Sequence, residues 1–76
     1  MATVPVPALS LGEVRALTLY ASGLTTPQVA ERMGVKYETA KTYLRRVREK
    51  YAKAGRPASK RADLVNRAID DGHFTP

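Results

Sequence analysis

Apolar residues recur along the chain at helical spacing, and no stretch alternates in the way that marks a half-buried strand. The pattern predicts four helices, from Leu11 to about Ser22, from Pro27 to Met33, from about 37 to 53 and from about 60 to 71. The predicted fold class is therefore all-α. One domain over residues 9–76 would follow a flexible tail or linker over residues 1–8, which contains two prolines and no helical period.

Residues that start and stop helices flank the first two segments. Ser10 is followed three residues later by Glu13, which is the spacing of a capping box. Pro27 suits the first position of a helix, where its missing N–H is not needed. Gly23 and Gly34 supply the positive φ that commonly ends a helix. The sequence therefore predicts a tight turn between the second and third helices.

The third segment separates apolar from polar side chains. At 100° per residue, five apolar side chains fall within an arc of about 100°; they are Ala40, Tyr43, Leu44, Val47 and Tyr51. The opposite side is polar and largely basic. One face is suited to a protein core and the other to a polyanion, with the two tyrosine hydroxyls expected to reach out to a phosphate or to water.

Charge is concentrated in the same part of the chain. Residues 36–61 contain ten of the thirteen Lys and Arg and two acids, so they carry +8 while the remainder carries −2. This suits a phosphate backbone, although a solvated basic face or an anionic lipid surface would have the same composition. A chain of 76 residues buries a modest core, so a deep enclosed active site is not expected.

Composition also narrows the chemistry. The chain has no cysteine, which excludes disulfides and thiolate metal sites and permits a reducing cytoplasm. Its apolar runs are too short for a membrane span. His73 is the single histidine, and Asp70 and Asp71 are expected on the solvent side of the fourth helix. We therefore expect a cytoplasmic protein without enzymatic activity, cofactor, catalytic residues, metal site or membrane contact.

The second and third segments together have the spacing of a helix-turn-helix. Val29 and Ala30 precede Gly34, and Ala40 and Tyr43 follow it. A small residue such as Ala30 lets two helices meet at a steep angle, and glycine allows the turn between them. A generic helical bundle with an incidental basic face shares these elements, but the segregated charge favours the helix-turn-helix.

With these elements placed, the sequence resembles the LuxR-type (GerE-type) helix-turn-helix domain from Leu9 to Phe74. The matching residues are Leu9-Ser10, Glu13, Leu17, Ala21-Ser22-Gly23-Leu24-Thr25, Val29-Ala30, Met33, Thr39-Ala40-Lys41, Tyr43, Val47 and Lys50. The resemblance implies four helices, the third in the major groove and the fourth as a dimer contact, in the output domain of a bacterial response regulator or quorum-sensing receptor. Tyr43 replaces a usual His, Tyr51 replaces a frequent Leu, and the segment before the fourth helix is longer.

The start of the third helix holds the predicted DNA contacts. Base edges are read near the start of a recognition helix because the major groove curves away from its far end, which selects Lys41, Thr42 and Arg45; Arg45 as a phosphate contact only is the alternative. Predicted phosphate contacts lie at helix starts or on the basic row of the third segment, which consists of Arg46, Arg48, Lys50 and Lys53. The predicted contacts are Thr25, Thr26, Lys36, Tyr37, Thr39, Arg46 and Lys50.

The fourth helix has an apolar arc of about 160°, wider than a core contact needs. Val65 and Ile69 are expected to pack inward, which leaves Leu64 and Ala68 for a second copy; Leu64, Val65 and Ala68 form the predicted interface of a weak homodimer. A wider core contact is the alternative.

The loop before the fourth helix holds Gly-Arg-Pro at residues 55–57, which is the core of minor-groove AT-hooks. A basic loop near the DNA backbone is favoured over insertion into the minor groove.

The sequence therefore predicts sequence-specific binding of double-stranded DNA by a bacterial transcription regulator. One alternative is a sigma-factor-like or recombinase DNA-binding unit, with RNA polymerase as a further candidate partner. Another is a protein-interaction module whose basic face binds an acidic partner.

Overall fold

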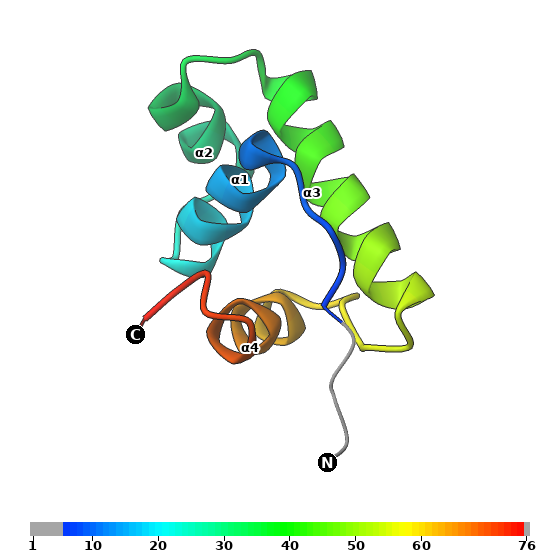
Figure 1. The fold of residues 1–76 in the computed structure, drawn as a ribbon. Helices are drawn as coiled ribbons and strands as arrows, with labels where there is room; N and C mark the ends of the chain where they lie inside the picture. Colours follow the sequence, from blue (N-terminus) through cyan, green and yellow to red (C-terminus); the bar gives the residue numbers. More distant parts are fainter. Residues whose placement is uncertain (1–5, 76) are drawn as a thin grey trace.

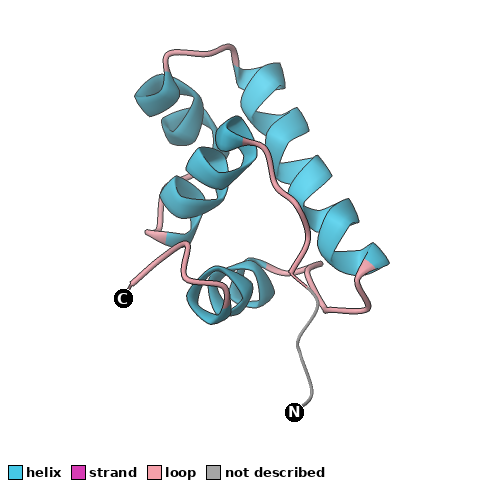
Figure 2. Ribbon diagram, in the orientation of Figure 1, coloured by secondary structure: helices cyan, strands magenta, loops and turns pink. Residues whose placement is uncertain are grey.

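The computed structural model describes residues 6–75, which form four helices and no strand (Figures 1 and 2). The helices are α1 (Leu11–Ala21), α2 (Thr26–Met33), α3 (Tyr37–Lys53) and α4 (Arg61–Asp70). α3 runs along one side of the molecule, α1 and α2 lie against it, and α4 lies below them in the view of Figure 1. The predicted all-α fold is confirmed, and each helix end lies within one residue of the prediction. Residues 1–5 of the predicted tail lie outside the described residues.

Two capping boxes fix where α1 and α2 begin. The Ser10 hydroxyl accepts from the Glu13 N–H at 3.2 Å, and the Glu13 carboxylate accepts from the Ser10 N–H at 2.8 Å. Thr25 and Gln28 exchange the equivalent bonds at the start of α2. Gly34 ends α2 with φ 68°, a left-handed conformation that L side chains rarely adopt. The chain therefore turns from α2 into α3 within three residues.

The apolar stripe of α3 lies in the core, as predicted. Ala40 and Leu44 pack in a cluster shared with α1 and α2, and Val47 and Tyr51 pack in a second cluster shared with α1 and α4. Tyr43 is half-buried at the edge of the first cluster, against Gly12 of α1. A Cβ at Gly12 would lie 2.8 Å from a Tyr43 ring carbon, so any other residue there would require the Tyr43 ring to shift. The buried stripe fixes the rotation of α3 and thus which of its side chains face outward.

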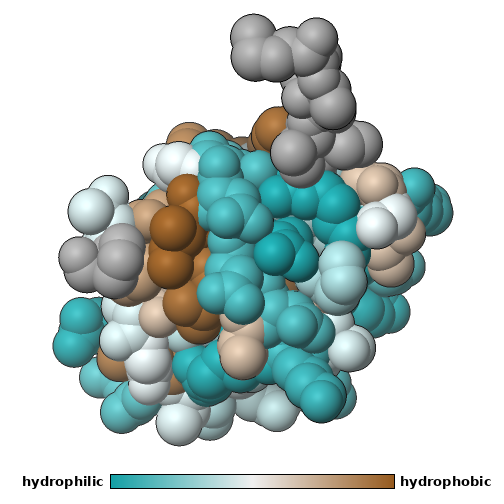
Figure 3. Space-filling model, turned by 90° about the horizontal axis from the view of Figure 1, so that it is seen from below, coloured by the Kyte–Doolittle hydropathy of each residue, from teal (hydrophilic) through white to brown (hydrophobic). Residues whose placement is uncertain are grey.

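The orientation of α4 differs from the prediction. Leu64 and Ala68 are fully buried in the chain's own core, where α4 packs on α1. They are not accessible to a second copy, so this part of the predicted dimer interface is wrong. Val65 is half-buried, and Ile69, predicted to face inward, is 38% exposed. Figure 3 shows a narrow apolar strip bordered by hydrophilic surface on the underside, where α4 lies.

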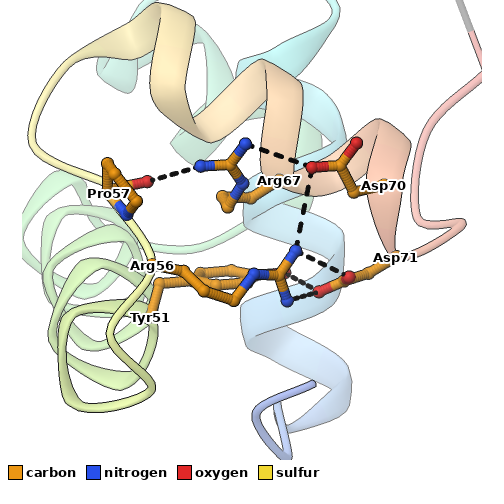
Figure 4. Close-up of polar contacts among 6 residues, drawn as sticks. All are labelled: Tyr51, Arg56, Pro57, Arg67, Asp70 and Asp71. Carbon is orange, nitrogen blue, oxygen red and sulfur yellow. Dashed lines mark hydrogen bonds and ion pairs between the residues drawn. The ribbon is translucent and has the colours of Figure 1, made fainter. Parts of the chain in front are cut away.

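A buried ionic cluster holds the loop between α3 and α4 (Figure 4). The Arg56 guanidinium donates two bonds to the Asp71 carboxylate, at 2.8 and 2.9 Å, and the Tyr51 hydroxyl donates a third at 2.7 Å. The Arg56 and Asp71 side chains are 8% and 2% exposed. Beside them, Arg67 donates to the Pro57 carbonyl and to the Asp70 carboxylate. The loop is thus held against the C-terminal end of α4.

This cluster corrects two expectations and also bears on minor-groove insertion, the less favoured alternative for the loop. Asp71 lies inside the fold and not on the solvent side of α4. The Tyr51 hydroxyl donates to Asp71, so it does not reach a phosphate or water. Arg56 is enclosed within the protein and cannot enter the minor groove.

The pKa values in the cluster follow from the same contacts. Burial opposes ionisation of Asp71, but the hydrogen bonds from Arg56 and Tyr51 and the Arg56 charge outweigh it, so the pKa of Asp71 is lowered. Burial and the hydrogen bond to the negative Asp71 raise the pKa of Tyr51. Asp71 and Arg56 therefore form a charged pair at neutral pH.

Candidate nucleic-acid interface

The three predicted base readers share one exposed surface. Lys41 and Arg45 are exposed and Thr42 is half-buried. With Glu38 and Arg48 they line a single shallow depression along α3. This surface lies opposite the apolar stripe, so packing of the stripe in the core turns the readers outward. The structure thus brings together the residues that the sequence selected.

Arg45 has one ionic contact within the chain. Its Nε lies 3.6 Å from the Glu49 carboxylate one turn later, and the two side chains are 66% and 57% exposed. An exposed pair of this kind contributes less than about 1 kcal/mol, because water screens it and two long side chains must be ordered. Arg45 is therefore able to exchange Glu49 for a base or a phosphate.

The predicted phosphate contacts fall at two helix starts. Lys36 and Tyr37 are exposed and Thr39 is half-buried where α3 begins. Thr25 caps α2 through its own hydroxyl, and Thr26 is the first residue of that helix. Helix starts carry free N–H groups and a partial positive charge, so both places attract anions.

Two predicted members of the basic row of α3 differ in environment. Arg46 is exposed. Lys50 donates to the Glu13 carboxylate at 2.6 Å and to the Ala8 carbonyl at 3.0 Å. Burial opposes ionisation of Glu13, whose side chain is 3% exposed, but Lys50 and Ser10 outweigh this and lower its pKa. The Lys50 ammonium thus already has two acceptors within the fold, and its side chain is 37% exposed, so its role as a phosphate contact stays a prediction.

Basic residues between 36 and 61 therefore divide into two groups. Four of them contact other parts of the fold; they are Arg48, Lys50, Arg56 and Arg61. The other six have exposed side chains; they are Lys36, Lys41, Arg45, Arg46, Lys53 and Lys60. Sequence reasoning did not separate the groups, because the partners of the first group lie far away in the sequence. The second group has its side chains exposed to solvent, where a polyanion can reach them.

Other kinds of site find little support in the described part of the chain. Within residues 6–75, no group of three His, Asp or Glu side chains could hold a metal ion. No helix in that range is long and apolar enough to cross a membrane. His73 is half-buried, and its backbone carbonyl accepts from the Thr18 hydroxyl at 3.0 Å.

Comparison with known proteins supports the interpretation of α2 and α3. No curated protein and no solved structure matches the chain. Residues 7–50 match the family described as sigma-70, region 4. The match covers α1, α2 and most of α3, and it ends before the loop and α4. The matched segment is more than half of the chain, so this protein belongs to the sigma-70 region 4 family of DNA-binding helix-turn-helix domains, which act in transcription.

Proposed function

We propose that this domain binds double-stranded DNA in a sequence-specific manner, with α3 in the major groove. The observation that carries the proposal is the shared exposed surface of Lys41, Thr42 and Arg45 on the first turns of α3. Lys and Arg suit the O6 and N7 acceptors of guanine, and the threonine methyl suits the methyl group of thymine. The buried stripe holds α3 in one orientation, so these side chains enter the groove together.

Backbone phosphates supply the remaining attraction. Six exposed Lys and Arg between residues 36 and 61, together with the starts of α2 and α3, form the positive surface. Neutralisation of about six phosphates gives a slope of log K against log salt near −5, at about −0.9 per phosphate. Affinity that changed little between low and moderate salt would contradict this electrostatic account.

Within transcription, we propose the role of a LuxR-type output domain of a bacterial regulator, acting in the cytoplasm without an enzymatic activity of its own. The resemblance to that class extends through α4 to Phe74, beyond the sigma-70 match. Two copies would recognise repeated half-sites through a weak dimer. Because Leu64 and Ala68 are buried, we propose Val65, which is half-buried, and Ile69, which is exposed, as the residues of that contact.

The second candidate is a sigma-factor-like unit that works on RNA polymerase, and the family match favours it. The two roles differ in what the isolated chain does. An output domain binds its duplex alone and dimerises on it, whereas a sigma-like unit binds RNA polymerase core enzyme. Analytical ultracentrifugation with duplex, and separately with core enzyme, distinguishes them.

The direct test compares alanine variants in a fluorescence anisotropy assay with a cognate and an unrelated duplex. Lys41→Ala and Arg45→Ala are expected to weaken cognate binding by about 10-fold or more and to leave weak general binding. Lys53→Ala is the matched control, since Lys53 is exposed at the far end of α3. If all three variants weakened both duplexes equally, base reading by Lys41 and Arg45 would be excluded. Absence of duplex binding by the parent chain would favour an acidic protein partner.

A further inference from the structure

We infer that Arg48 is an additional DNA phosphate contact and that Tyr20 of α1 is the residue that positions it. This inference rests on the proposed DNA binding and adds one contact and one supporting side chain to the same interface. Arg48 borders the depression that contains Lys41, Thr42 and Arg45. It also borders the adjacent cavity between α3 and the loop at residues 55–59. Arg48 thus lies at the edge of the surface that holds the three predicted base readers.

The Arg48 side chain is held by an aromatic ring. Its guanidinium carbon lies 5.6 Å from the centre of the Tyr20 ring, and its Nη2 donates to the Tyr20 hydroxyl at 3.4 Å. The ring is itself fixed by Arg61, whose guanidinium carbon lies 3.7 Å from the ring centre. Arg61 also donates to the carbonyls of Tyr20 at 2.7 Å and Leu24 at 2.9 Å. A row of three side chains therefore connects the start of α4, through the end of α1, to the middle of α3.

The two arginines of this row have no carboxylate partner within residues 6–75, because neither Arg48 nor Arg61 forms an ion pair there. Both Nη atoms of Arg61 donate to backbone carbonyls. Arg48 makes one long bond to a hydroxyl, and its enclosed Nε has no acceptor. A guanidinium has five N–H donors, so Arg48 retains capacity for an anion.

The anion that fits is a backbone phosphate of the bound duplex. Guanidinium groups bind phosphate oxygens with paired hydrogen bonds, and α3 in the major groove places the flanking backbone along its sides. Tyr20 restricts the rotamers of Arg48 before binding, so less side-chain freedom is lost on contact. Tyr20 itself is a positioning residue and does not touch DNA.

The test measures the salt slope together with affinity, in the full chain, by fluorescence anisotropy on the cognate and an unrelated duplex. Arg48→Ala is expected to weaken binding to both duplexes by about 10-fold and to reduce the slope by about 1. Arg48→Lys keeps the charge, so it is expected to retain the slope with an affinity loss of about 3-fold. Tyr20→Phe removes only the hydroxyl and is expected to lower affinity about 3-fold with the slope unchanged.

A packing role for Arg48 gives a different pattern. Arg48→Ala would then lower the free energy of unfolding in urea while the affinity and salt slope of the folded protein stayed at parental values, and that result would overturn the inference. Lys41→Ala separates this failure from failure of the proposed function. If Lys41→Ala still loses cognate binding while Arg48→Ala and Arg48→Lys do not, DNA reading stands and the Arg48 contact is excluded. If Lys41→Ala also has no effect, the proposed function itself fails.

Discussion

Replacement of Asp71 by asparagine tests how the loop between α3 and α4 is held. In the parent chain the Asp71 carboxylate accepts three hydrogen bonds, two from Arg56 and one from Tyr51. Asparagine keeps the shape but has one acceptor oxygen and a donor amide. At least one bond is therefore lost, and the Arg56 guanidinium, whose side chain is 8% exposed, loses the buried carboxylate and keeps the longer contact to Asp70 at 3.8 Å.

The magnitude follows from this burial. Removal of one partner from a buried ion pair lowers the free energy of unfolding by about 3 to 5 kcal/mol. A domain of 76 residues has about 4 to 11 kcal/mol in total, so Asp71→Asn removes a large part of it. Taking about 3 kcal/mol, the melting temperature falls by about 12 to 24 °C. The Asp70 side chain is 51% exposed at the edge of the same cluster, so Asp70→Asn is expected to change the free energy of unfolding by less than about 1 kcal/mol.

Urea unfolding followed by circular dichroism measures both variants, with equal m-values as the sign that only stability has changed. Equal free energies of unfolding for Asp71→Asn and Asp70→Asn would refute the assignment of Asp71 to the buried pair. A loss below about 1 kcal/mol in Asp71→Asn would refute it as well.

Acid stability, DNA affinity at Arg45 and the turn between α2 and α3 each give a further prediction. The pKa values of Glu13 and Asp71 are lowered in the folded protein, so their ionised carboxylates stabilise the fold at pH values above the ordinary carboxyl pKa range. The free energy of unfolding is therefore expected to stay level down to about pH 5 and to fall below about pH 4. Urea titrations at a series of pH values check this, and a steeper acid loss in Asp71→Asn than in the parent would contradict it. Glu49→Gln removes the acid beside Arg45 and is expected to raise duplex affinity about 3-fold in anisotropy, with an unchanged or lower affinity as the contrary result. Gly34→Ala is expected to lower stability by about 1 kcal/mol through backbone strain at φ 68°, since its Cβ would meet no atom; an unchanged thermal midpoint would contradict this.

Features that depend on neighbouring residues were predictable from the sequence. The capping pair Ser10 and Glu13, the left-handed Gly34 and the apolar stripe of α3 each arise from a few residues close in the chain. They fix the helix ends and the outward side of α3. Lys41 and Arg45 therefore face outward as predicted, because their orientation follows from the stripe.

Features that depend on distant contacts were not predictable in this way. The apolar arc of α4 was wide enough for either side to face inward, and packing on α1 selected Leu64 over Ile69. Lys50 meets Glu13 across 37 residues, and Arg61 meets the Tyr20 carbonyl across 41. The spacing of residues within one helix does not predict contacts between residues that lie so far apart in the sequence. The composition therefore does not distinguish the Lys and Arg side chains that have partners within the fold from those that remain exposed.

Selection of bound sequences from random duplex DNA tests most directly whether α3 reads base edges with Lys41, Thr42 and Arg45. We expect enrichment of a short half-site containing guanine, together with loss of that guanine preference when selection is repeated with Arg45→Ala. Enrichment of the same half-site by the parent chain and by a Lys41→Ala/Arg45→Ala double variant would contradict the claim. Recovery of no common sequence from the pool bound by the parent chain would contradict it too.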